Sequence, residues 1–415
     1  MLIIIYLTLF SFYLFGYFRK MEPNYPILYI KKDRVASIKR KHPWIFSRGV
    51  LAHDPIDDGA IVEIHSKGKG YLATGYYQDG SILVRLLSFE GELIDQGYWD
   101  RKIANAMALR TKIDLPNAHT NAYRLFHGEG DGVPGLIIDV YNDVAVIQCH
   151  TVGIHLMIDQ IATALTKTLG ASLDSIYDKS KNALPQTYSS RLKDGCIRGD
   201  KTKVIIQENK HTFEIDLINS QKTGFFLDQR DNRQLLGLYA KDKRLLNLYC
   251  YTGGFSIYAI HHGATAVCSI DASRTAMATL EENLRLNGGY DQHISLTEDV
   301  NRYIATIQAH DYDIIVVDPP AFAKSIRKRH NAVQAYKRVN AAAIAKVAPG
   351  GMIFTFSCSQ VIDAKLFYDT ITAAAIETGR QCRVIHHLSQ GADHPVSIYH
   401  PEGKYLKGLV LEVGA

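Results

Sequence analysis

The sequence lacks the paired cysteines from which zinc sites and disulfide frameworks are built. Its six cysteines stand at positions 149, 196, 250, 268, 358 and 382, and no two of them form a CxxC pair. Scattered thiols argue against both kinds of site and suit a reducing compartment. We therefore expect a cytoplasmic protein that binds no metal.

Charge of one sign and long biased tracts are also scarce. Lys and Arg exceed Asp and Glu by only 47 to 42, and the sequence pI is about 8.7. This mild excess is compatible with RNA binding without proving it. A chain of 415 residues, of which 47% are hydrophobic, is too long for one ordinary core, so two or three globular domains are expected.

Residues 1–18 carry no charge and are followed by Arg19 and Lys20. Their length makes them a candidate membrane helix. A signal peptide fits poorly, because there is no basic region at the start and no small-residue cleavage site. Since the rest of the chain suits the cytosol, we favour an over-extended start, with translation from Met21, or a disordered tail over a membrane anchor. Residues 1–26 are therefore treated as an extension.

Residues 27–100 read as short strands separated by turn residues. The clearest are 60–64, 71–77 and 81–87, and their close spacing predicts a small β-barrel. A basic stretch precedes them and contains Lys39, Arg40 and Trp44. Cations beside an aromatic ring can hold phosphates and stack a base, whereas the alternative places Trp44 in the barrel core.

Residues 101–200 have a mixed pattern that predicts a small α+β domain. A helix is expected over 98–112 and another over 154–169, and strands 136–141 and 144–149 flank a hairpin turn. The stretch FHGEGDGVPG, residues 126–135, lacks the strand-then-helix context of a phosphate loop, so we interpret it as a system of tight turns.

From residue 201 to 415 strands alternate with helices, which is typical of a parallel sheet covered on both faces. The expected strands are 243–248, 266–270, 312–317 and 352–356, and the expected helices are 255–262, 273–287 and 331–347. Ligands of such sheets bind at the carboxyl ends of the strands, so the residues just after each apolar run are the candidates for a site.

Two of these strand ends suit a nucleoside. The first is followed by NLYCYTGGF, in which paired glycines before a helix allow close approach to the backbone, although neither GxGxxG nor GK[ST] is formed there. Asp271 ends the second strand and suits two ribose hydroxyls, whereas its structural alternative is a helix N-cap. Asp299 follows a third apolar stretch and could reach an adenine amino group.

The remaining strand ends suit a chemical step. One ends in Asp318, Pro319 and Pro320, and two prolines there would hold the backbone rigid and aim the carboxylate. The other ends in FSCSQ, which places Cys358 at the same edge. A thiol at the polar end of a strand is a candidate nucleophile, and a small buried residue is the alternative. Cys250 sits at this edge beside the expected cofactor, and we interpret it as packing.

Five segments resemble, in their order along the chain, the motifs of class I S-adenosylmethionine methyltransferases. They are 247–255, 271, 299, 318–322 and 357–359. QKTGFFLDQRDNR, residues 221–233, is similar to the segment before the first motif in 23S rRNA cytosine-5 methyltransferases that carry an N-terminal PUA domain. The resemblance spans residues 27–415. It implies a PUA barrel, a small α+β domain and a Rossmann-like methyltransferase domain, hence an α/β protein that binds S-adenosylmethionine.

The resemblance also implies roles for residues. Those expected to bind the cofactor are Phe226, Gln229, Arg230, Asn247, Tyr249, Tyr251, Thr252, Gly253, Phe255, Asp271, Asp299 and Asp318. Those expected to contact large-subunit ribosomal RNA are Lys39, Arg40, Trp44, Pro319, Pro320, Phe322, Lys324, Arg327, Lys328 and Arg329, and the basic ones would neutralise phosphates or form a solvated loop. Oligomeric state, including a homodimer, stays open.

The implied reaction assigns Cys358 as the nucleophile. Its thiolate would add to carbon 6 of cytosine, which turns carbon 5 into a nucleophile, and Asp318 would hold N3 and the exocyclic amine. Because a free thiol has a pKa near about 8.5, we expect a neighbour to lower it. Many related enzymes use a second cysteine where this chain has Ala321, so the base that removes the carbon-5 proton is not identified.

Three other functions stay open. Methylation of guanine N7 or adenine N6 would leave Cys358 without a role, whereas uracil carbon 5 would use the same thiol addition. A non-catalytic RNA-binding assembly factor would need none of the catalytic groups.

Overall fold

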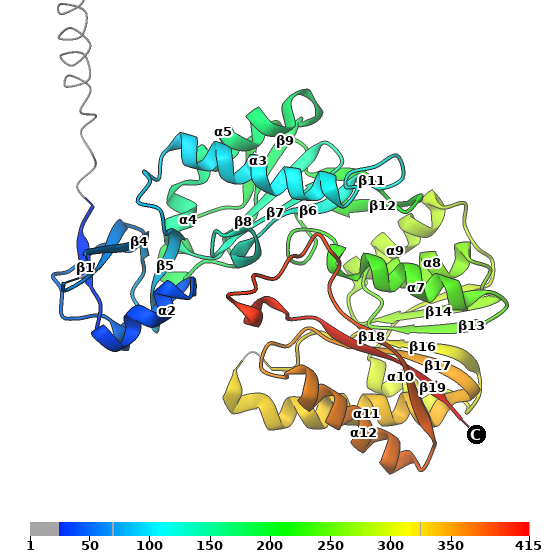
Figure 1. Cartoon of the computed structure of the whole chain (residues 1–415). Helices are drawn as coiled ribbons and strands as arrows, with labels where there is room; N and C mark the ends of the chain where they lie inside the picture. Colours follow the sequence, from blue (N-terminus) through cyan, green and yellow to red (C-terminus); the bar gives the residue numbers. More distant parts are fainter. Residues whose placement is uncertain (1–24, 69, 324, 415) are drawn as a thin grey trace, which may run out of the picture.

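The computed structural model describes residues 25–414 except 69 and 324 (Figure 1). The segment considered as an extension or anchor therefore lies outside the described residues, apart from its last two positions. Within the described part of the chain, no helix is both long and apolar enough to cross a membrane.

The first sheet is built from residues 27–88 and has the strand order β1-β3-β4-β5-β2. Its strands are β1 (Ile27–Tyr29), β2 (Trp44–Phe46), β3 (Ile61–Ser66), β4 (Gly70–Tyr77) and β5 (Ile82–Ser88), and the helix α2 (Val35–Lys39) joins the first two. Alternate residues of β3 are buried, Val62 and Ile64 fully, as expected for a strand with one face on a core. The three strands predicted here are confirmed.

The second sheet has the order β10-β9-β8-β7-β6. Its strands are β6 (Ala122–His127), β7 (Leu136–Tyr141), β8 (Val144–Cys149), β9 (Ser175–Asp178) and β10 (Gly195–Arg198). The predicted hairpin is confirmed, with Asn142 at φ 56° in its turn. Helices α3 (Gln96–Lys112) and α5 (Ile158–Leu169) pack on this sheet, and the single helix predicted over 154–169 is two, because α4 (Val152–Leu156) ends before Met157. A short helix, α6 (Gln186–Ser189), precedes β10.

The third sheet has seven strands in the order β15-β14-β13-β16-β17-β19-β18. They are β13 (Arg244–Leu248), β14 (Ala266–Asp271), β15 (His293–Thr297), β16 (Tyr312–Val317), β17 (Val347–Ser357), β18 (Cys382–Leu388) and β19 (Lys407–Val413), and β19 pairs antiparallel with both of its neighbours. The four strands predicted here are confirmed. The continuous apolar strands reflect burial on both faces.

Helices cover both faces of this sheet (Figure 1). One face packs on α7 (Arg230–Ala240) and α8 (Gly254–His261), and the other on α10 (Val300–Thr306), α11 (Arg329–Lys346) and α12 (Ala364–Thr378). Neighbouring residues of one strand, Leu245 and Leu246, belong to opposite cores. The helix α9 (Arg274–Leu286) packs against the hairpin of β11 (Lys203–Glu208) and β12 (His211–Asp216). The three helices predicted in this part are confirmed as α8, α9 and α11.

The segment between β18 and β19, residues 389–406, leaves the third sheet and contacts the other two. We call it the cross-over segment. The backbone N–H of Arg124 in β6 donates to Asp393 Oδ2 at 3.0 Å, and the rings of Trp44 in β2 and His400 have centroids 4.3 Å apart. These contacts tie all three sheets together.

Candidate active site

The carboxyl ends of β13, β14, β16 and β17 meet at one edge of the third sheet. In the pairing register, Leu248 of β13 lies opposite Ile270 of β14 and Val317 of β16, and Val317 lies opposite Thr355 of β17. The residues that follow these strands therefore emerge side by side. This confirms that Asp318 and Cys358 share an edge, with the turn after β13 next to them.

The turn after β13 has an unusual backbone. Tyr249, Tyr251 and Gly253 have φ values of 60°, 49° and 84°. Residues other than glycine rarely adopt this left-handed backbone conformation, and where they do the strain is often part of a functional site. Hydrogen bonds hold the turn in place, because the Cys250 N–H donates to Ile270 O at 3.0 Å and the Gly253 N–H to Cys250 O at 2.9 Å.

Asp271 braces this turn from the end of β14. One carboxylate oxygen accepts from the Tyr251 N–H at 3.0 Å and the other from the Ser273 N–H at 2.8 Å. The N-cap of α9 is Ser273, whose Oγ accepts from the Ala276 N–H at 3.2 Å, so Asp271 is not the cap. Asp299, in contrast, is exposed and caps α10 through the Arg302 N–H at 3.0 Å.

The residues around the turn fit the adenosyl part of S-adenosylmethionine. Asn247 Oδ1 and Thr252 Oγ1 are buried polar atoms without a hydrogen-bond partner among the described residues. Buried polar atoms of this kind usually have a partner, and a bound ligand can supply it. The rings of Phe226 and Tyr251, 5.1 Å apart between centroids, add an aromatic wall. Phe255 is buried in the core beneath the turn, where it packs rather than lines a site.

Arg230 does not point to this turn. Its guanidinium is buried and donates to Ala122 O at 2.8 Å and to Asp393 Oδ2 at 3.1 Å. Its predicted role in binding the cofactor is corrected to one in joining β6 to the cross-over segment. Gln229 does lie at the edge, because its Nε2 donates to Asp318 Oδ2 at 2.9 Å while Asn232 Nδ2 donates to its Oε1 at 2.6 Å.

Asp318 is held in a partly buried position at the end of β16. Burial, and next the nearby Asp228 carboxylate, raise the pKa of Asp318 to about 7, against the lowering effect of the Gln229 amide. A carboxyl with such a pKa can give a proton near neutral pH. Pro319 is buried and Pro320 exposed, and the Phe322 ring packs edge-on against Tyr336 at 4.7 Å between centroids.

Cys358 is partly buried between two serines that are buried and held by hydrogen bonds. Ser357 Oγ donates to Tyr336 Oη at 3.0 Å and Ser359 Oγ to Ala323 O at 2.9 Å. Lys407 Nζ donates to Ser359 O at 2.6 Å. The two serines and Lys407 thus fix the backbone on both sides of the thiol.

The expected lowering of the thiol pKa is wrong for the protein alone. Burial, then the carboxylates of Asp318 and Asp228, raise the pKa of Cys358 to about 11, and Lys222 lowers it only in part. Cys250 is buried, and its Sγ lies 3.6 Å from Met277 Sδ, which confirms that it packs.

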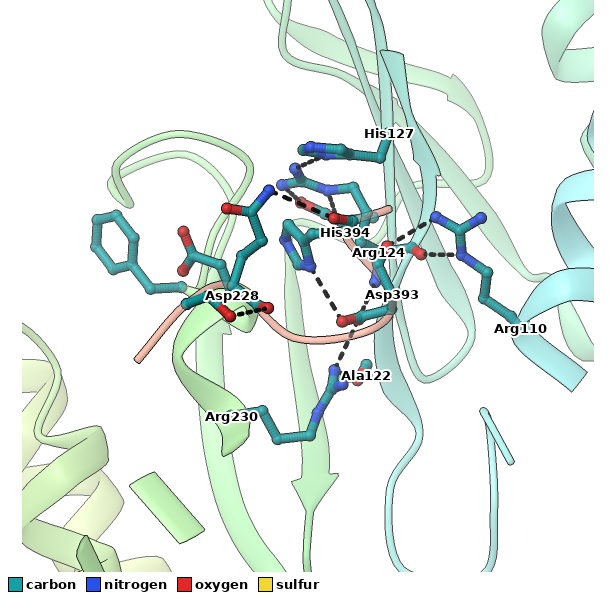
Figure 2. A network of polar contacts seen from close by, with 12 residues as sticks. Arg110, Ala122, Arg124, His127, Asp228, Arg230, Asp393 and His394 are labelled. Atoms are coloured by element: carbon teal, nitrogen blue, oxygen red, sulfur yellow. Dashed lines mark hydrogen bonds and ion pairs between the residues drawn. The ribbon is translucent and has the colours of Figure 1, made fainter. Parts of the chain in front are cut away.

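Sequence reasoning missed a buried polar network that joins the second sheet to the cross-over segment (Figure 2). Arg110 donates to Asp131 at 2.6 Å and to Asp393 O at 2.7 Å, and Arg124 donates to Asp139 at 2.5 Å. Asp131, in the GEGDG stretch at residues 128–132, was the sequence feature that could have indicated this network. A Cβ on Gly130 of that turn would meet Pro395 O at 1.9 Å, which explains a glycine there.

It also missed the contact of Asp228 with Tyr405. The Tyr405 hydroxyl donates to Asp228 Oδ2 at 2.6 Å. The two residues are 177 positions apart, so no local pattern pairs them.

Trp44 is not in the core of the first sheet. It is partly buried, its Nε1 donates to Glu129 Oε1 at 2.9 Å, and its ring faces His400. A cavity of about 500 Å³ beside it is lined by Arg34, His42, Phe46 and Arg48 among others. The described cations predicted to contact RNA are exposed in two places, namely Lys39 and Arg40 at the end of α2, and Arg327, Lys328 and Arg329 after Phe322. Lys324 lies outside the described residues.

Comparisons with known proteins agree with this architecture. A family model described as S-adenosylmethionine-dependent methyltransferase matches residues 180–395, and one described as PUA-like domain matches residues 28–89. "Ribosomal RNA large subunit methyltransferase I" of Aeromonas salmonicida is 37% identical over 396 residues, which cover 92% of this chain and 98% of that protein. The protein of that name from Vibrio cholerae (strain El Tor Inaba N16961) is 35% identical over 397 residues, 94% of this chain and 99% of that one.

Solved structures show the same fold. The structure called "A putative sam-dependent methyltransferase from Streptococcus mutans" has a TM-score of 0.80 at 22% identity and covers 93% of this chain and all of that one. A second, described as complexed with SAH, has a TM-score of 0.81 with the same identity and coverage.

Proposed function

Because the chain belongs to the family of S-adenosylmethionine-dependent methyltransferases, we propose that it methylates carbon 5 of a cytosine in large-subunit ribosomal RNA through a covalent adduct with Cys358. The observation that carries the proposal is the placement of a partly buried thiol and a carboxyl with a raised pKa at one sheet edge, beside the turn that fits the cofactor.

Ribosomal RNA as the substrate is supported by the names of the relatives and by the PUA-like domain. The exposed cations Arg327, Lys328 and Arg329 follow directly on the strand end that carries Asp318, so they can meet phosphates next to the target base. A base within structured RNA would be unstacked and flipped out to the sheet edge that carries Asp318, beside these cations. Pro319, Pro320 and Phe322 would then line the space for the base.

The roles of the two catalytic groups follow from their charge states. Cys358 attacks carbon 6 as a thiolate, so its proton must first pass to water, and its raised pKa makes the uncharged thiol the resting form. Asp318, with a pKa of about 7, is partly protonated at neutral pH and can donate a proton to cytosine N3. Protonation of N3 draws electrons from carbon 6 as the sulfur adds, so the negative charge of the thiolate is consumed in the new C–S bond while the Asp318 carboxyl becomes a carboxylate.

S-adenosylmethionine supplies an electrophilic methyl group when it is bound. Asn247, Thr252 and Asp271 would hold it, through two buried oxygens without partners and a carboxylate fixed by the turn. Methylation of guanine N7 or adenine N6 needs no thiol, so the fixed position of Cys358 between two anchored serines supports chemistry at carbon 5.

Nucleoside mass spectrometry tests the proposal. Protein-free large-subunit ribosomal RNA is incubated with S-adenosylmethionine and either the natural protein or Cys358→Ala. We expect 5-methylcytidine with the natural protein only. A methylated guanine or adenine that survives the substitution would contradict the proposal, and 5-methyluridine would move the reaction to uracil. If no product forms, assembled subunits replace the free RNA, and a second failure supports a non-catalytic assembly protein.

A further inference from the structure

Asp228 lies beside the reaction edge without an assigned role. It belongs to the short 3₁₀ helix Leu227–Gln229 that leads into α7. Its Oδ2 accepts from the Tyr405 hydroxyl at 2.6 Å, and its backbone O accepts from the Gly391 N–H at 3.3 Å. Its Oδ1 is buried and has no hydrogen-bond partner among the described residues. One carboxylate oxygen is thus anchored and the other is free.

Asp228 precedes Gln229, whose Nε2 donates to Asp318 Oδ2 at 2.9 Å, so its backbone lies next to a group at the reaction edge. The charge of Asp228 raises the pKa of Asp318 and that of Cys358, and among charged neighbours it is the largest such influence on Asp318. The Gln229 side chain thus bridges Asp318 and Asn232, because Asn232 Nδ2 donates to its Oε1 at 2.6 Å.

We propose that Asp228 is the base that removes the carbon-5 proton at the end of the reaction, and that Tyr405 positions its carboxylate. The inference rests on the function proposed above and supplies the step for which the chain has no second cysteine, since Ala321 stands after the two prolines.

The step balances as follows. After methyl transfer, carbon 5 carries both its hydrogen and the methyl group, and carbon 6 carries the Cys358 sulfur. The free Asp228 oxygen takes the proton, the electrons of the C–H bond form the double bond between carbons 5 and 6, and the C–S bond breaks to release the thiolate. The proton then passes from Asp228 to water, and no oxidant or reductant is consumed.

Two adjacent carboxyls suit opposite tasks. Like charges at close range cannot both ionise freely, so one of a pair is held protonated while the other stays a carboxylate. Asp318 is the one whose pKa is raised, which suits a donor to N3. The Tyr405 hydroxyl donates to Asp228 Oδ2 at 2.6 Å, and burial raises the pKa of Tyr405 well above the usual value, so Tyr405 stays a donor.

Asp228→Asn tests the proposal, because an amide keeps the shape and loses the base. Thiol addition and methyl transfer should proceed, and release should stop. With RNA and radiolabelled S-adenosylmethionine, we expect a methylated protein–RNA adduct on a denaturing gel and release of 5-methylcytidine reduced at least about 100-fold, the usual effect of a general base. The adduct should vanish in Asp228→Asn combined with Cys358→Ala. Asp318→Asn should lose both adduct and product, because it acts before addition.

Asp231→Asn is the matched control, since Asp231 is an exposed acid on the same segment and should turn over normally. Tyr405→Phe keeps the base but removes the hydrogen bond that positions its carboxylate. We therefore expect less trapped protein–RNA adduct than with Asp228→Asn, and a pH dependence of product release that differs from that of the natural protein. This variant carries the test if Asp228→Asn does not fold.

The proposal is overturned if folded Asp228→Asn turns over like the natural protein, or if it loses activity without forming an adduct. In both cases the natural protein still makes 5-methylcytidine, and the proposed function stands. If the natural protein makes none on free RNA or on assembled subunits, the proposed function and this inference fail together.

Discussion

The carboxyl edge of the third sheet has two halves that hold their functional groups in different ways. The half proposed to bind the cofactor follows β13 and β14 and is shaped by backbone conformation, with Tyr249 and Tyr251 in the left-handed region and Asp271 bonded to the turn. The reaction half follows β16 and β17 and is shaped by close charges, namely Asp318, Asp228 and Lys222 around Cys358.

The two cysteines of this edge show the difference. Burial raises the pKa of both thiols, and the charge of a carboxylate raises it further, that of Asp271 for Cys250 and that of Asp318 for Cys358. Cys250 is buried in an apolar cluster, whereas Cys358 is partly accessible. A raised pKa therefore does not distinguish a packing thiol from a nucleophile. The two kinds of thiol are distinguished by the accessibility of the sulfur and by a proton donor next to the substrate.

The largest contrast is expected between Cys358→Ala and Cys250→Ala. Removal of the proposed nucleophile Cys358 should lower kcat by about 10⁴-fold or more, as for other covalent catalysts. Cys250→Ala should keep kcat and lose about 1 kcal/mol of unfolding free energy, because it leaves a small gap. Methyl transfer to RNA and thermal unfolding measure the two effects. Equal losses of activity would remove the distinction between the halves.

Asp318→Asn should lower kcat by about 10²- to 10⁴-fold, the range for loss of a general acid. Asp313→Asn is the matched control at the other end of β16, where Asp313 is paired with Arg244 at 3.0 Å near the surface. It should leave kcat unchanged and reduce stability by about 1 kcal/mol or less. Single-turnover kinetics with saturating RNA would show whether the two acids differ in this way.

Alkylation by iodoacetamide should respond to pH and to charge at Cys358 but not at Cys250. Because the Cys358 pKa is raised to about 11, its thiolate fraction and alkylation rate should rise about tenfold per pH unit up to that value. Asp318→Asn removes a negative neighbour and should speed alkylation, and Lys222→Gln should slow it, each by up to about tenfold. Peptide mass spectrometry resolves the two thiols. Slower alkylation of Asp318→Asn or faster alkylation of Lys222→Gln would show that these charges do not set the reactivity of Cys358.

The smallest effect concerns two groups of exposed cations, one after Phe322 and one at the end of α2. Replacing Arg327, Lys328 and Arg329 together by Gln should reduce the slope of log affinity against log salt by about 2, since three phosphate contacts are lost at about 0.7 each. The pair Lys39 and Arg40 on α2 is the comparison and should reduce it by about 1.4. Binding to the RNA is measured by filter retention at several salt concentrations. An unchanged slope would show that the loop carrying Arg327, Lys328 and Arg329 is solvated and does not contact phosphates.

Local sequence patterns predicted the third sheet and much of the site. The strand 312–317 coincides with β16 and places Asp318 at its carboxyl end, and the apolar runs of β14 and β17 do the same for Asp271 and Cys358. These predictions succeed because alternation of buried strands and helices is written in neighbouring residues, and parallel strands put their carboxyl ends on one edge.

Contacts between distant segments were not predicted. Arg230 stands within the resembling segment yet binds Asp393, 163 positions away, and Trp44 bonds to Glu129 of another sheet rather than filling its own. The position of the cross-over segment, and with it Tyr405 at Asp228, follows from how the three sheets pack.

The sequence by itself thus determined the order of strands and helices, the edge on which the site lies, and the residue types present there. Only the tertiary structure decided which charges meet at that edge, the direction in which the Cys358 pKa moves, and which carboxylate oxygen is left free. The physical reason is that secondary structure follows from local periodicity, whereas a pKa and a hydrogen-bond partner depend on burial and on charges brought together from distant parts of the chain.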